Sequence, residues 1–154
     1  MAQVVIRLRG TLNIKPKIKD TLHYLRLNRV NHCVVLPDNE TTLGMLQVAK
    51  DYVTWGPVDA DTLSEAIRSR GRLVGDKPIT DEYVKAHTSH AGIDVWAKAI
   101  AAGQAQFKDL PEVKPLLRLH PAKKGLEGVK RSYRNGGALG FRGEEINQLL
   151  RRMV

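Results

Sequence analysis

The chain has 154 residues, of which 42% are hydrophobic, so it is long enough for one domain with a buried core. Its 25 Lys and Arg outnumber its 16 Asp and Glu, and the formal net charge of +9 favours a polyanionic partner, either nucleic acid or an anionic membrane surface. The single Cys33 excludes an intramolecular disulfide framework, and no apolar run approaches the ~20 residues of a bilayer span, so we expect a cytoplasmic protein.

The first 58 residues alternate short strands with amphipathic helices. We predict strands over 3–9, 32–36 and 52–58, and helices over 16–27 and 43–52, from apolar spacings of two and about 3.6 residues. This order is typical of an α+β fold in which two helices cover one face of a small sheet. In the first strand Arg7 and Arg9 lie opposite the apolar side, so we expect them on the uncovered face.

The remaining residues divide into a mostly helical extension, 59–117, and a basic tail, 118–154. In the extension, Thr62 and Glu65 form a capping-box pattern, Gly71 is a helix stop and Thr80 caps the next helix. A third helix is expected over 94–102. The tail is irregular and Gly-rich up to residue 143, and a helix over 144–153 closes it, with Ile146, Leu149, Leu150 and Met153 available for burial.

The positive charge is concentrated at the two ends of the chain. Residues 1–37 carry a net charge of +6, residues 38–117 carry −3, and residues 118–154 carry +6. General solubility is served by interspersed charges rather than by blocks of one sign. The distribution therefore favours polyanion binding by at least one of the two basic blocks.

The first basic cluster is Lys15, Lys17 and Lys19, at the start of the first predicted helix. The helix dipole is positive there, so lysines are unfavourable by a few tenths of a kcal/mol each unless an anion lies beyond the helix end. We interpret the cluster as a phosphate contact. The alternative is a solvated lysine run that tolerates the small cost.

The stretch from Arg118 to Arg142 is the stronger candidate for nucleic-acid binding. It combines Lys and Arg with His120, Tyr133 and Phe141 in a segment of low periodicity. Irregular RNA offers phosphates, 2′-hydroxyls and unstacked bases, which cations and rings of this kind recognise. The alternative is a disordered basic tail.

No pattern indicates catalysis, a metal or a cofactor. His87 and His90 lack a third ligand nearby, Cys33 lies in an apolar strand, and the glycines after Asn135 do not follow a strand. We therefore expect a protein that is not an enzyme. Two alternatives stay open, a small ferredoxin-like enzyme or ligand-sensing domain using His32 or His120, and an RNA chaperone.

Two stretches resemble a known family. The sequence from RLRGTLNIKPKIK to DYVTWG resembles the core of the L-thirty family of large-subunit ribosomal proteins. The end resembles the long archaeal and eukaryotic form, called L-seven in eukaryotes, through LHP, a basic run, a Gly-Gly turn and INQLLRRM in that order. The chain starts at the first strand without a long basic extension, which favours the archaeal type.

The resemblance implies a ferredoxin-like core with a three-stranded sheet and a structural role in the large ribosomal subunit. It implies large-subunit ribosomal RNA and neighbouring ribosomal proteins as partners, with no small-molecule substrate and no obligate homo-oligomer. Carried over by motif, the RNA-facing residues are Arg7, Arg9, Lys15, Lys17, Lys19, His120, Lys123, Lys124, Lys130, Arg131, Tyr133, Arg134 and Arg142.

Overall fold

The computed structural model describes residues 2–154 and has an α+β architecture, as predicted. The strands are β1 (Gln3–Arg7), β2 (His32–Leu36), β3 (Val53–Pro57), β4 (Leu117–Arg118) and β5 (Gly140–Phe141). The helices are α1 (Pro16–Tyr24), α2 (Glu40–Ala49), α3 (Ala60–Arg70), α4 (Asp81–His87), α5 (Ile93–Ala101) and α6 (Glu145–Met153), with 3-10 turns η1 (Phe107–Asp109) and η2 (Tyr133–Asn135). None of these helices is long and apolar enough to cross a membrane.

One sheet with the order β4-β2-β1-β3-β5 runs through the centre of the molecule. β1 lies between β2 and β3 and is antiparallel to both, so that Val5 pairs with Val34 on one side and Trp55 on the other. These are the three predicted strands. Two-residue strands from later in the chain extend both edges, β4 antiparallel to β2 and β5 parallel to β3. The basic tail is therefore attached to the sheet.

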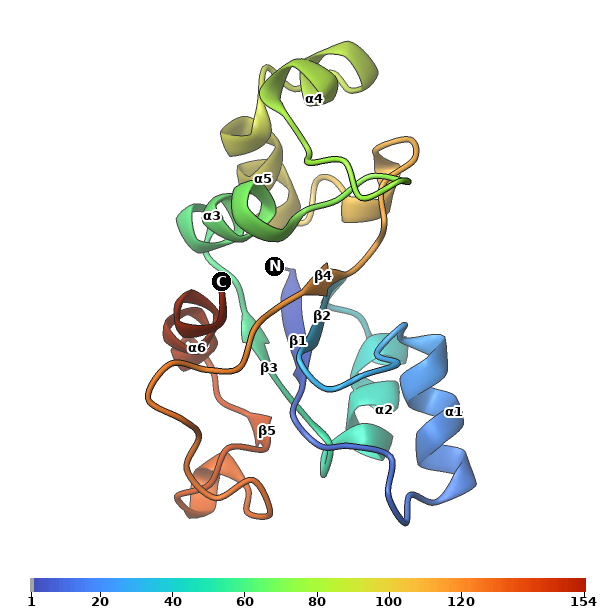
Figure 1. Ribbon diagram of the computed structural model, residues 1–154, viewed down its shortest axis with the longest axis vertical. Helices are drawn as coiled ribbons and strands as arrows, with labels where there is room; N and C mark the ends of the chain where they lie inside the picture. The colour runs from blue at the N-terminus through green and yellow to red at the C-terminus, as the bar shows by residue number, and fades with distance from the viewer. Residues whose placement is uncertain (1) are drawn as a thin grey trace.

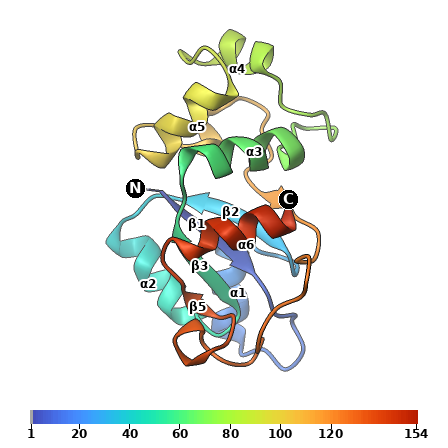
Figure 2. The same cartoon turned by 90° about the vertical axis from the view of Figure 1, so that its left-hand side faces the viewer.

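Helices cover both faces of the sheet (Figures 1 and 2). α1 and α2 pack on the face that carries Val5 and Trp55. α6 packs on the opposite face, beside α3 and α5, and encloses a larger cluster that includes Ile6, Trp96 and Ile146. The predicted uncovered face was wrong, because α1 and α2 bury the side of β1 that carries Arg7, whose side chain is 2% exposed.

Two helices begin three residues before their predicted starts, because an earlier Asn or Asp side chain caps each of them. The Asn39 side chain accepts a hydrogen bond from the Thr42 N–H at 2.8 Å, and the Asp59 side chain accepts one from Thr62 N–H at 2.7 Å. The predicted capping box at Thr62 was therefore wrong. The cap predicted at Thr80 is confirmed, since its Oγ1 accepts from the Tyr83 N–H at 3.2 Å.

α1 ends three residues earlier than predicted, at a Schellman turn. The Leu27 N–H donates to the Leu22 carbonyl at 2.9 Å, and the Arg26 N–H donates to the His23 carbonyl at 3.0 Å. Arg26 has a φ of 64°, a conformation in which glycine is usual. Leu22 and Leu27, on either side of the turn, are both buried in the cluster between α1, α2 and the sheet. The Arg26 side chain between them is exposed.

Candidate nucleic-acid interface

The start of the tail is anchored to the end of α6. The His120 N–H donates to the Met153 carbonyl and the Lys123 N–H donates to the Arg152 carbonyl, both at 3.1 Å. The two ring nitrogens of His120 lie 2.6 and 2.7 Å from the carbonyl oxygens of Val154 and Pro121. The imidazole of His120 is thus occupied by contacts within the protein, while the Lys123 side chain is exposed.

Residues 128–139 form a compact loop rather than an extended strand of basic residues. The Tyr133 N–H donates to the Leu139 carbonyl at 2.7 Å, and the Leu139 N–H donates to the Arg131 carbonyl at 3.1 Å. Gly137 lies so close that an added Cβ would be 2.1 Å from the Arg131 carbonyl oxygen. The loop therefore has a defined shape, and it leaves the side chains of Lys130, Arg131 and Arg134 exposed.

Arg142 fastens this loop to the sheet. Its Nε donates to Thr54 Oγ1 at 2.8 Å and its Nη2 donates to the Ala138 carbonyl at 2.6 Å. Its guanidinium carbon lies 5.0 Å from the centre of the Tyr133 ring, and burial lowers the pKa of the group. Arg142 thus joins β3 to the loop and supports the ring of Tyr133, which is 37% exposed.

The first basic cluster is exposed at the start of α1. Lys15 is the N-cap residue and Pro16 occupies the first turn, which contains no acidic residue. The Lys15 side chain makes no capping hydrogen bond. Lys17 and Lys19 are also exposed, so all three ammonium groups surround the positive end of the helix without a neutralising carboxylate in its first turn.

Arg7 and Arg9 have different surroundings although they are two residues apart. Arg7 is buried, where its Nε donates to the Arg9 carbonyl at 2.8 Å and its Nη1 to the Leu27 carbonyl at 2.7 Å. Desolvation lowers the pKa of its guanidinium. Arg9 is half-buried, lies 5.0 Å from the centre of the Tyr52 ring and donates weakly to the Asp51 carbonyl at 3.3 Å. Only Arg9 is near the surface.

Part of each basic block lies at one end of the molecule, which we call the basic end: residues 9–19 from the first block and residues 128–142 from the second. The connection between β1 and α1 and the loop below β5 both lie at the lower end of Figures 1 and 2, and α4 lies at the opposite end. The sheet order explains this arrangement, because β1, β3 and β5 are successive neighbours. Residues more than a hundred positions apart in the sequence therefore contribute to one basic end.

The exposed cations of this basic end have no carboxylate partners. Every ion pair within residues 2–154 uses residues elsewhere, namely Arg68 with Asp81 and Asp94, Lys114 and Arg118 with Asp76, and Arg151 with Glu65. None of the residues predicted to face RNA takes part in one. Their charge is therefore available to an anion outside the protein.

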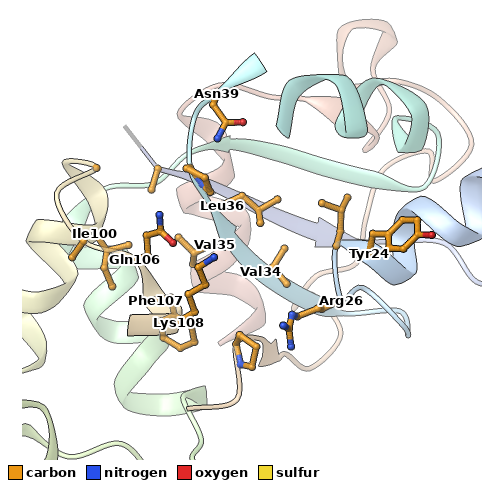
Figure 3. A pocket seen from close by; sticks show the side chains of 16 residues that line it. Tyr24, Arg26, Val34, Val35, Leu36, Asn39, Ile100, Gln106, Phe107 and Lys108 are labelled. Atoms are coloured by element: carbon orange, nitrogen blue, oxygen red, sulfur yellow. The ribbon is translucent and has the colours of Figure 1, made fainter. Parts of the chain in front are cut away.

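The sequence analysis did not select Arg26, Arg29 and Arg118, which lie along the outer edge of β2. Arg26 lines a groove of about 530 Å³ whose floor is Val34 and Leu36 (Figure 3). Arg29 and Arg118 flank His32 and, with burial, lower the pKa of its imidazole. The sequence signal was the pair of arginines in LRLNRVN, which is weaker than the lysine cluster before it.

The other titratable groups form no reactive site. Within the described residues, no three His, Cys, Asp or Glu side chains come together as metal ligands would. His87 stacks on Tyr83 with ring centres 4.1 Å apart. Cys33 is fully buried in β2, and burial raises the pKa of its thiol, which disfavours the reactive thiolate.

Comparison with known proteins gives a consistent result. Residues 4–53 match the family model described as Ribosomal protein L30p/L7e. The chain is 52% identical over 149 residues to a protein of Methanoculleus marisnigri named Large ribosomal subunit protein uL30, and the match covers 97% of both chains. Proteins with the same name from Archaeoglobus fulgidus and Methanocorpusculum labreanum are 51% and 50% identical, again over 97% of each chain.

Proposed function

This chain belongs to the ribosomal protein L30p/L7e family and is a constituent of the large ribosomal subunit, and we propose that it binds ribosomal RNA there through the basic end of the molecule. The observation that carries the proposal is the absence of ion pairs among the exposed cations at that end, within the described residues. A dense array of unneutralised cations is the electrostatic footprint of an RNA-binding surface.

The predicted RNA-facing residues divide into two groups by their surroundings. Exposed or half-exposed side chains contact phosphates, sugars and bases directly; these are Arg9, Lys15, Lys17, Lys19, Lys123, Lys124, Lys130, Arg131, Tyr133 and Arg134. Arg7, His120 and Arg142 are occupied by hydrogen bonds within the protein. Their role is to position the basic surface, because a buried or bonded group has little left to offer RNA.

The helical extension is the part that we assign to contacts with protein neighbours. Residues 59–117 contain nine acidic and eight basic residues, a net charge of −1, so the extension has no excess of cations with which to attract phosphate. The family consists of structural ribosomal proteins and is not an enzyme family, which counts against a small enzyme or ligand-sensing domain. Relatives matched over nearly the whole chain also count against a chaperone outside the ribosome.

The test reverses charge on the loop of residues 128–139. Filter binding to large-subunit ribosomal RNA would compare the wild type with the triple variant Lys130→Glu/Arg131→Glu/Arg134→Glu over a range of salt concentrations. We expect affinity to fall about 100-fold. The salt dependence should flatten by the equivalent of roughly two to three phosphate contacts, since fewer counterions are released when fewer phosphates are neutralised.

A matched control carries the same change of charge in the extension, Lys77→Glu/Lys85→Glu/Lys98→Glu, where none of the three lysines takes part in an ion pair within the described residues. Thermal melting monitored by circular dichroism would establish that both variants are folded. If the two variants lose the same affinity, general charge rather than the basic end determines binding, and the proposal fails.

A further inference from the structure

Arg7, Arg29 and Arg118 lie around His32 near the β4 edge of the sheet. His32 on β2 pairs directly with Arg118 on β4. Arg7 follows Ile6, which pairs with Cys33, so Arg7 lies beside His32 on the other neighbouring strand. Arg29 closes the turn before β2, where the His32 N–H donates to its carbonyl at 3.2 Å. Three guanidinium groups thus act on one imidazole.

The basic groups of this cluster outnumber the carboxylates that form ion pairs with them. Among the described residues, the one ion pair that these four residues make joins Arg118 Nη1 to Asp76 at 3.6 Å, and that carboxylate is already 2.5 Å from Lys114 Nζ. Arg7 Nη2 and His32 Nδ1 are buried, and neither has a hydrogen-bond partner among the described residues. The neighbouring guanidinium groups of Arg29 and Arg118 are exposed, and a phosphate at this edge would accept strong, charge-assisted hydrogen bonds from them.

The groove in Figure 3 lies next to this cluster, along the part of β2 that follows His32 and Cys33. β4 pairs only with His32 and Cys33, so the outer edge of β2 from Val34 to Leu36 is open and forms the groove floor. The ring of Tyr24 borders the groove and is 74% exposed. An exposed ring beside an apolar floor is the kind of surface on which an unstacked base packs.

The charges of the groove favour RNA over a peptide. Arg26 and Lys108 are the charged side chains that line it, on opposite walls in Figure 3, and no acidic side chain lines it within the described residues. Gln106 adds an amide that can hydrogen-bond to a base edge. Cations, an amide, an aromatic ring and an apolar floor together match a nucleotide better than an extended protein segment.

We propose that the outer edge of β2 is a second RNA-binding site, in which Arg29, His32 and Arg118 bind a backbone phosphate and the adjacent groove takes an unstacked base. The proposal rests on the proposed function, because it takes ribosomal RNA as the ligand. β4 and β5 are opposite edges of the sheet. RNA would therefore contact the protein at two separate places, the basic tail and the β4 edge.

The first experiment maps the site on the full chain by nuclear magnetic resonance. Inorganic phosphate, a short single-stranded RNA and polyglutamate would be titrated in turn while the side-chain signals of Arg29, His32 and Arg118 and the ring signals of Tyr24 are followed. We expect phosphate to shift the first three and RNA to shift all four. Shifts caused by polyglutamate but not RNA would overturn the RNA assignment, as would shifts with inorganic phosphate alone.

The second experiment measures affinity for large-subunit ribosomal RNA with Arg29→Ala/Arg118→Ala and with Tyr24→Ala, each at an exposed position. The control is Lys85→Ala/Lys98→Ala in the extension. We expect the double arginine variant to lose about tenfold in affinity, with one to two fewer phosphate equivalents in the salt dependence. We expect Tyr24→Ala to lose several-fold with an unchanged salt dependence, because a stacking contact releases no counterion.

These outcomes separate the two proposals. If the double arginine variant matches its control while the triple glutamate variant of the tail still weakens binding, the second site is disproved and the basic end stands as the RNA surface. If the tail variant also matches its control, the proposed function fails as well. If both weaken binding and their effects add, two independent RNA contacts are established.

Discussion

The helical extension and the basic tail both carry many charged residues, but they use them differently. In the extension, Arg68 bridges Asp81 and Asp94, each at 3.1 Å, and the helices are held by apolar packing such as the stacked rings of Trp96 and Phe107. The tail makes no such pairs between 119 and 150. α6 packs on the sheet through its apolar side, while the loop of residues 128–139 is held by backbone hydrogen bonds, close glycine contacts and Arg142.

This difference in ion pairing determines which charged residues can bind a partner outside the protein. A cation in an ion pair within the protein is already largely neutralised, so it attracts an anion of a partner only weakly. A cation displayed by a loop that is fixed through its backbone keeps its whole charge. Fixing the backbone also means that less conformational freedom is lost when RNA binds. The tail thus combines order with unneutralised charge.

The largest expected effect comes from detaching the tail and α6 from the sheet. In Gly56→Ala, the new Cβ would be 2.1 Å from the Gly143 carbonyl oxygen and 2.9 Å from Ile146. We expect a loss of about 3 kcal/mol in the free energy of unfolding, measured by urea denaturation, because overpacking of this kind forces backbone shifts. The control is Gly44→Ala on α2, which meets nothing within 4 Å and should gain about 0.5–1 kcal/mol. Equal stabilities for the two variants would contradict the packing argument.

A smaller effect is expected when only the loop is deformed. In Gly137→Ala the Cβ would be 2.1 Å from the Arg131 carbonyl oxygen, so the loop must open. We expect about 2 kcal/mol of lost stability together with weaker RNA binding, although no cation has been removed. Urea denaturation and filter binding would measure the two changes. Gly10→Ala, whose nearest contact is 4.0 Å away, is the control and should leave both unchanged.

Acid should loosen the extension before the tail. The Ile93 N–H and then Arg68 lower the pKa of Asp81, and Ser64 and then Arg68 lower that of Asp94. Because these folded pKa values lie below the ~3.9 of an unfolded aspartate, their stabilisation is complete above about pH 4 and is lost as the pH falls through the folded values.

Amide hydrogen exchange at α3 and α5 between pH 5 and pH 3 would follow that loss. In Asp81→Asn, part of the dependence should disappear, because the ion pair with Arg68 is absent at every pH. Faster opening of the tail than of the extension across this range would contradict the assignment.

The smallest effect on stability is expected at Arg26, and its sign is unusual. Arg26 has a φ of 64° at the end of α1, which costs an L-residue about 1 kcal/mol that glycine avoids. We expect Arg26→Gly to leave stability unchanged or to raise it by up to about 1 kcal/mol in thermal melting, while affinity for RNA falls. Lys98→Gly, at an exposed position inside α5, should instead lose about 1 kcal/mol. A destabilised Arg26→Gly would show that the arginine has a structural role.

Local patterns were sufficient to predict most of the elements. His32–Leu36 was predicted with its observed bounds, and Ile146, Leu149, Leu150 and Met153 are all buried as expected. The helix starts at Asn39 and Asp59 were missed, because many Asn and Asp residues could cap and only the backbone conformation selects one. Leu43 is apolar and three residues from the buried Leu46, yet it is 41% exposed, because the buried side of α2 is formed by Thr42, Leu46 and Ala49.

The sequence by itself determined the elements, the concentration of positive charge at the two chain ends and the resemblance to a ribosomal family, since composition, periodicity and motifs are local properties. Only the tertiary structure decided that Arg7 is buried, that the tail adds β5 beside β3, and that Arg29, His32 and Arg118 converge. These facts depend on which strands become neighbours and which faces helices cover. Both follow from packing among residues far apart in the chain, which no local pattern records.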